Sequence, residues 1–244
     1  MEIRQAVLLK WIDDVFKKAK VYQQVLIVAG IGVIVLGSAG FGYIYYKNKV
    51  RAAAYKDFMT AIQCYDGVVK NKKVSSDYPS IKQFESEKDK WTQTEQVFRQ
   101  GYQNYKNTEL APAFLSFQAE ALLNLGKIDE AIKVLKEVVS QVKSAEIKDS
   151  YKVKIALINL DKKDEKAQSD ALNELISVAN NDSSAANEVA LYQVGSYFWN
   201  QKKYNEAKDY WQRLLVKTTA KSGQVSVYAG EVREKLGLIT AESL

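Results

Sequence analysis

The chain has 244 residues, with 35 Lys and Arg, 29 Asp and Glu, one cysteine, two prolines, no histidine and a formal net charge of +6. The lack of histidine excludes a histidine general base and imidazole metal ligands, and a single cysteine excludes an intrachain disulfide and a thiolate zinc site. Because two prolines favour long helices over strands and turns, we expect an all-α protein that binds rather than catalyses, without a cofactor or metal.

Residues 1–20 predict an amphipathic helix, because apolar residues recur every three or four positions with charged residues between them. The apolar positions are Ile3, Val7, Leu8, Trp11, Ile12, Val15 and Phe16. Since Trp and Phe line this stripe and the other face is mixed but basic, we expect the helix to lie in a membrane surface or to dock on a membrane partner. The alternative, a helix that merely extends into water, would expose seven large apolar side chains.

Residues 21–46 contain no charged side chain. About 20 apolar residues cross a hydrocarbon core, so this run predicts a transmembrane helix. Tyrosines at both ends of the run suit the headgroup layer, and Lys47, Lys49 and Arg51 follow it. The alternative is a cleaved signal peptide, but its apolar region would span only about 7–15 residues.

Within this run, Ser38 and Gly42 form a small-xxx-small pair. Such a pair allows another membrane helix to approach closely, so self-association through the span is one expectation. The alternative is that these residues reflect only the ordinary abundance of small residues in membrane helices.

The basic residues flanking the run do not decide its orientation, because five precede it and four occupy the first fifteen positions after residue 46. The sizes of the flanking segments decide the orientation, because a short leader stays in the cytoplasm and a large following domain is translocated largely regardless of charge. We therefore expect a cytoplasmic amino terminus and an extracytoplasmic domain, residues 47–244.

Residues 47–244 contain an internal repeat that resembles the tetratricopeptide repeat, W-x2-L-G-x2-Y…A-x3-F. The clearest copy has Leu191, Val194, Gly195, Phe198, Ala207 and Trp211, and a second copy has Leu115, Gln118, Ala119, Leu122, Ala131 and Leu135. Small residues stand where two helices come closest, which is the role predicted for Gly195 with Ala207 and for Ala119 with Ala131.

Between these copies, residues 148–180 predict a degenerate unit whose polar turn, 161–164, is three residues longer than the other turns. Residues 49–68 and 82–106, separated by a loop over 71–80, predict a divergent first pair whose leading helix continues from the span. Residues 225–239 predict a capping helix. The sequence therefore predicts an α-solenoid of about four helix pairs and a cap.

The concave surface of such a solenoid is built from the first helix of each pair. The candidate partner-binding residues are Ala113, Ser116, Glu120, Asn124, Tyr192, Ser196, Trp199 and Asn200. Asn124 and Asn200 occupy equivalent positions, where an amide can hold the backbone of an extended peptide. The alternative for each residue is packing or solvation. Ser116 and Glu120 cannot form the Lys and Asn clamp with which some tetratricopeptide domains grip chaperone carboxyl termini.

The whole layout resembles the YfgM-type ancillary subunits of the bacterial SecYEG translocon. The shared features are the leader, one span, the basic stop and an Ala-rich helix at residues 51–55, Arg-Ala-Ala-Ala-Tyr. The resemblance implies an inner-membrane protein whose periplasmic domain meets translocon subunits, chaperones or translocating chains. Two departures are the long insertion between the first two helices and the replacement of the repeat-closing proline by Lys143 and Thr219.

The sequence lacks the features of a nucleotide-binding enzyme and of a nucleic-acid-binding protein. Gly126 and Lys127 do not form a phosphate loop, because Ala121 and Ile128 stand where Gly and Ser or Thr are needed. Residues 47–244 hold 30 basic and 26 acidic residues with mixed signs, so no nucleic-acid partner is expected. The alternative that stays open is a cytosol-facing, amino-terminally anchored receptor, which resembles the tetratricopeptide import receptors of the mitochondrial surface.

Overall fold

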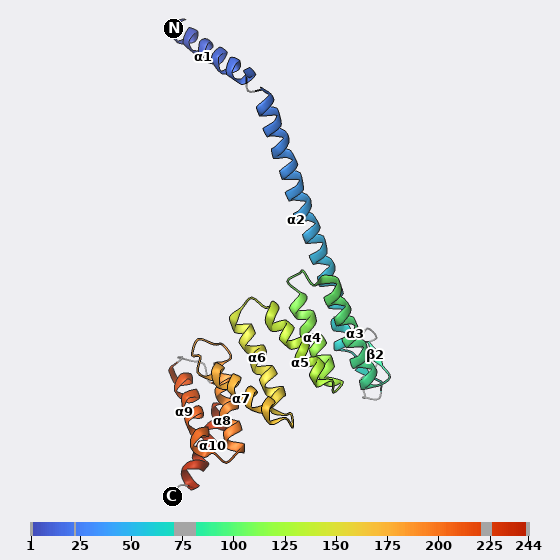
Figure 1. The fold of residues 1–244 in the computed structure, drawn as a ribbon, viewed down its shortest axis with the longest axis vertical. Coiled ribbons are helices and arrows are strands. Elements are labelled where there is room, and N and C mark those ends of the chain that lie inside the picture. Colours follow the sequence, from blue (N-terminus) through green and yellow to red (C-terminus); the bar gives the residue numbers. More distant parts are fainter. Residues whose placement is uncertain (1, 22, 71–81, 221–225, 243–244) are drawn as a thin grey trace. The chain divides into compact units, whose positions relative to one another are not determined.

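The computed structural model describes residues 2–21, 23–70, 82–220 and 226–242 (Figure 1). In these ranges the chain forms ten α-helices and one pair of two-residue strands, so the predicted all-α class is confirmed. The chain divides into two compact units, Met1–Ala53 and Ala54–Leu244.

The first unit contains α1 (Glu2–Val21) and the leading part of α2 (Gln23–Tyr65). Among the described residues, no helix combines the length and the apolar character that crossing a membrane requires. Most of the predicted span, residues 21–33 and 35, lies outside the residues whose side chains the structure describes. Ser38 and Gly42 are exposed on α2; the Ser38 hydroxyl donates to the Ile34 carbonyl, and a Cβ added at Gly42 would meet no atom within 4 Å.

The second unit is a helical solenoid. The end of α2 packs on α3 (Glu87–Tyr105), followed by the pairs α4 (Ala111–Asn124) with α5 (Ile128–Gln141), α6 (Ala145–Leu160) with α7 (Glu165–Ala179), and α8 (Asn187–Asn200) with α9 (Tyr204–Ala220). α10 (Ala229–Glu242) then packs on α9. The helices follow one another in chain order, as predicted for four pairs and a cap (Figure 1).

Local signals in the sequence set where several helices begin. The side chain of Ser86 accepts a hydrogen bond from the Asp89 amide at the start of α3, and Asp164 accepts from the amides of Lys166 and Ala167 at the start of α7. Such caps satisfy amide groups that have no partner within the helix.

The turns after α4 and α8 have the same backbone geometry. Gly126 has φ +72° and Lys202 has φ 59°, and these residues are 76 positions apart, the same offset that relates the two predicted repeat copies. In both turns the next amide, Lys127 or Lys203, donates at 2.9 Å to a carbonyl five residues earlier. This pattern is a Schellman motif, in which glycine is the favoured residue at the left-handed position.

The small residues of the repeat are in the core, as predicted. Ala119, Ala131 and Ala207 are fully buried. Gly195 is also buried, and an added Cβ would lie 2.3 Å from the Trp211 indole nitrogen. The glycine therefore allows a tryptophan ring to lie against the backbone of α8.

The predicted position of the extra length in the middle repeat is wrong. The turn between α6 and α7 has four residues, 161–164, against three in the turns at 125–127 and 201–203. Most of the extra length lies in α7, which begins six residues before Ala171, whereas α5 and α9 begin three residues before Ala131 and Ala207. Because Asp164 caps α7 early, the added residues form another helical turn.

A short parallel strand pair was not predicted from the sequence. β1 (Val68–Val69) pairs with β2 (Gln83–Phe84), bringing together the two ends of the insertion after α2. Residues 71–81, which include the predicted loop, lie outside the described residues. Cys64 is buried close to this pair, and the Lys82 ammonium lies 3.0 Å from its sulfur.

Candidate functional site

The eight candidate groove residues lie on α4 and α8, the first helices of two pairs. Asn124 and Asn200, at the carboxyl-terminal ends of these helices, are exposed. The other six side chains are half-buried: Ala113, Ser116, Glu120, Tyr192, Ser196 and Trp199. Contacts with neighbouring helices explain the burial of four of them, Ser116, Glu120, Tyr192 and Trp199.

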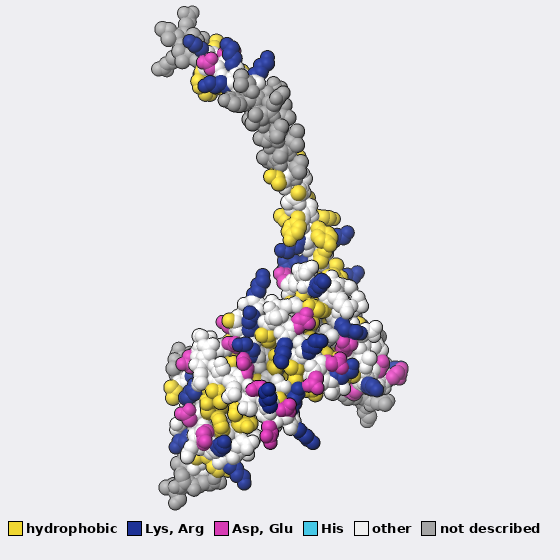
Figure 2. All heavy atoms as spheres, viewed as in Figure 1, with side chains coloured by type: hydrophobic (Ala, Val, Ile, Leu, Met, Phe, Trp, Pro, Cys, Tyr) yellow, Lys and Arg dark blue, Asp and Glu magenta, His cyan; other side chains and the backbone are white. Residues whose placement is uncertain are grey.

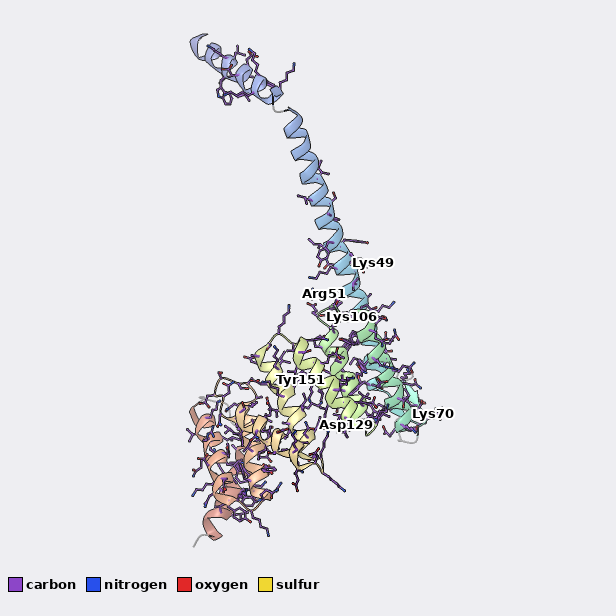
Figure 3. The ribbon with its side chains drawn as sticks, in the orientation of Figure 1. Lys49, Arg51, Lys70, Lys106, Asp129 and Tyr151 are labelled. Atoms are coloured by element: carbon purple, nitrogen blue, oxygen red, sulfur yellow. The ribbon has the colours of Figure 1, made fainter. Side chains whose placement is uncertain are left out.

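On α4, the half-buried polar residues contact α6, the first helix of the next pair. Tyr151 lies on α6 (Figure 3). The hydroxyls of Ser116 and Tyr151 lie 2.5 Å apart, and the Lys154 ammonium lies 2.6 Å from a carboxylate oxygen of Glu120. Tyr151 and Lys154 are three residues apart and therefore share one face of α6. These two links connect the first helices of successive pairs.

On α8, Tyr192 makes similar contacts with α10 and with the residue just before it. Its hydroxyl donates to Glu231 at 2.7 Å, and its ring stacks on Tyr228 with the centroids 4.2 Å apart. Burial and then the bond to Glu231 raise the pKa of Tyr192 above its ordinary value. The hydrogen bonds from Lys235 and then Tyr192 lower the pKa of the Glu231 carboxyl.

Trp199, also on α8, belongs to an aromatic cluster with Tyr204 and Trp211 of α9. Its ring centroid lies 5.0 Å from that of Tyr204 and 5.5 Å from that of Trp211. The Lys235 ammonium lies 5.9 Å from the Trp199 centroid and 5.4 Å from the Trp211 centroid, within range of cation–π attraction. Ser196, one turn before Asn200 on α8, has its hydroxyl shielded from solvent.

These contacts divide the predicted groove into two kinds of residue. Ser116, Glu120, Tyr192 and Trp199 connect successive first helices, so their polar and aromatic groups already have partners in the chain. Asn124 and Asn200 instead present carboxamides to solvent, although Asn124 also donates to the Glu120 carbonyl at 2.9 Å. The part of the predicted groove open to a partner is thus at the ends of the first helices.

Four residues that cover the predicted groove were not predicted from the sequence: Tyr151, Lys154, Glu231 and Lys235. Their signal was the pairing of an aromatic residue with a charged residue three positions later, at Tyr151 with Lys154 and at Tyr228 with Glu231. On the visible face of the second unit, basic and acidic side chains are intermixed (Figure 2). Within the described ranges, no group of three or more acidic or cysteine side chains is arranged to hold a metal ion.

Two segments of the chain, residues 118–144 and 189–217, match the family model described as tetratricopeptide repeat. These two segments are tetratricopeptide repeats. The matched segments fall on α4 with α5 and on α8 with α9, the two copies that the sequence predicted. Tetratricopeptide repeats indicate a protein–protein interaction scaffold, which confirms that part of the predicted function.

Among solved structures, the crystal structure of BtubC (BKLC) from P. vanneervenii is similar at 14% sequence identity and a TM-score of 0.47. The similarity covers 78% of this chain and 80% of that chain. No curated protein matches the chain.

Proposed function

We propose that the protein is a membrane-anchored scaffold that binds protein partners through the ends of its first helices. The observation that carries this proposal is the exposure of Asn124 and Asn200 at equivalent places in the two tetratricopeptide segments. A carboxamide offers both a donor and an acceptor, which suits the backbone of an extended peptide. In sequence, the uncharged residues 21–46, followed by Lys47, Lys49 and Arg51, support the anchor.

We further propose that this scaffold works beside the protein translocon of a bacterial inner membrane, with its amino terminus in the cytoplasm and its repeats in the periplasm. The resemblance to YfgM-type subunits supports this placement, as does the size of the domain that follows residue 46. The partners would be translocon subunits, periplasmic chaperones or translocating chains.

Protease accessibility tests the placement. In spheroplasts, an added protease is expected to digest the repeats, residues 54–244, and to leave a membrane-bound amino-terminal fragment. Protection of the repeats until the inner membrane is broken would place them in the cytoplasm and favour the cytosol-facing receptor. Release of the chain by alkaline carbonate would contradict anchoring by residues 21–46.

Purification of the intact protein in mild detergent tests the translocon assignment. We expect translocon subunits or periplasmic chaperones to copurify and an Asn124→Ala, Asn200→Ala double variant to recover several-fold less of them. The control is Lys136→Ala with Gln212→Ala, which changes exposed residues on the second helices at the same 76-residue offset. Equal recovery from both double variants would contradict the proposed binding surface.

A further inference from the structure

The helix α1 has one apolar half and one charged half. With 3.6 residues per turn, the side chains described between residues 8 and 20 divide without exception into these two halves. The apolar half contains Leu8, Leu9, Trp11, Ile12, Val15 and Phe16, and the charged half contains Lys10, Asp13, Asp14, Lys17, Lys18 and Lys20.

The apolar half of α1 is open to its surroundings. Leu9, Trp11 and Phe16 are 65%, 66% and 70% exposed, and Leu8 and Val15 are exposed as well. A continuous surface of two aromatic and several aliphatic side chains marks an interaction site, because water would otherwise solvate it at a cost.

The charged half indicates what covers the apolar half. It carries four lysines against two aspartates, and the Lys17 ammonium lies 2.8 Å from the Asp13 carboxylate. Lysine stems are long enough to place their ammonium groups in a headgroup layer while the adjacent apolar side chains reach the acyl chains. An anionic bilayer surface matches both halves, because its acyl chains accommodate the apolar side chains and its phosphate groups attract the lysines.

We propose that α1 lies along the surface of an anionic bilayer, with its apolar half among the acyl chains and its lysines at the phosphate groups. Helices of this kind bury their apolar face about 5–10 Å into the boundary between headgroups and acyl chains. This proposal rests on the proposed function in one respect, because the anchor at residues 21–46 would hold α1 at the same bilayer. It does not depend on the partner surface at Asn124 and Asn200.

The experiment uses the full chain with Cys64→Ala, so that one new cysteine at a time can carry an environment-sensitive fluorophore. Leu8→Cys and Phe16→Cys place the label on the apolar half, and Lys10→Cys and Lys17→Cys place it on the charged half. The labelled proteins are reconstituted into vesicles of phosphatidylcholine with phosphatidylglycerol, and into vesicles of phosphatidylcholine alone.

In the anionic vesicles we expect blue-shifted emission at positions 8 and 16, and about twofold weaker quenching by aqueous iodide than at positions 10 and 17, because burial of this depth removes a label from water. In phosphatidylcholine alone this contrast should shrink, since each lysine loses its attraction to anionic lipid. Equal quenching at all four positions in anionic vesicles would overturn the proposal, and an unchanged contrast without phosphatidylglycerol would overturn its dependence on charge. Extraction by carbonate, measured in parallel, reports separately on the anchor.

Discussion

Trp211 lies against Gly195, and its indole nitrogen donates to the Tyr192 carbonyl at 3.3 Å. Trp211 is fully buried, and the Trp199 ring and the Lys235 ammonium lie close to its ring. This one contact therefore connects the core of the last repeat to Tyr192 and Trp199, which hold α10.

Gly195→Ala is expected to destabilise the second unit by about 1–3 kcal/mol, because the added methyl group overlaps the buried indole ring and the core must shift. The free energy of unfolding in urea, followed by circular dichroism, measures the loss. The control is Gly237→Ala on α10, where an added Cβ meets no atom within 4 Å. That variant should be neutral or up to about 1 kcal/mol more stable, since alanine is the better helix former. Equal effects of the two substitutions would contradict the close approach of Trp211.

Lys202→Gly is expected to stabilise the protein by about 1 kcal/mol. A left-handed backbone costs a residue with a Cβ about 1–2 kcal/mol, and glycine avoids this cost. Part of the stabilisation is lost because glycine makes the unfolded chain more flexible. Gly126→Ala, at the equivalent turn, should destabilise the protein by a similar amount. Thermal unfolding of the two variants beside the parent provides the comparison. Destabilisation by Lys202→Gly would show that the turn after α8 is not left-handed at this residue.

Glu120 and Lys154 are expected to couple by less than about 1 kcal/mol in a double-mutant cycle of Glu120→Gln and Lys154→Gln, because both side chains are partly exposed and water screens the pair. Chemical denaturation of the four proteins gives the coupling energy, and added salt should reduce it. A coupling above about 2 kcal/mol would mean that the pair is far less solvated than the structure shows.

The carboxyl of Glu231 should make the docking of α10 sensitive to acid. Its pKa in the folded protein is lowered from 4.5, so the stabilisation is present above that value and is lost as pH falls through the lower folded pKa. The difference in unfolding free energy between the parent and Glu231→Gln should therefore be constant near neutral pH and shrink below about pH 4.5. In a Lys235→Gln background the shrinkage should be smaller, because Lys235 is the largest cause of the lowered pKa. A difference that grows on acidification would contradict this linkage.

The repeat spacing predicted which residues form the core, because the pairing of two helices depends on side-chain size at fixed offsets. Ala119, Ala131 and Ala207 are fully buried for this reason. The close approach of Gly101 to Phe114 was missed, since the divergent first pair lacks the spacing that identifies the later ones. The covering of Ser116 and Tyr192 was also missed, because it depends on how each pair is rotated against the next, and no local pattern encodes that rotation directly.

Site-specific photo-crosslinking in intact cells tests the central claim most directly, namely that partners bind at the ends of the first helices. A photoreactive amino acid is placed at Asn124 or Asn200. The control positions are Lys136 and Gln212, which are exposed on the second helices and are 76 positions apart, as Asn124 and Asn200 are. We predict crosslinks to a common protein partner from positions 124 and 200 and several-fold weaker ones from positions 136 and 212. Crosslinks that form only from positions 136 and 212 would show that partners bind the opposite face.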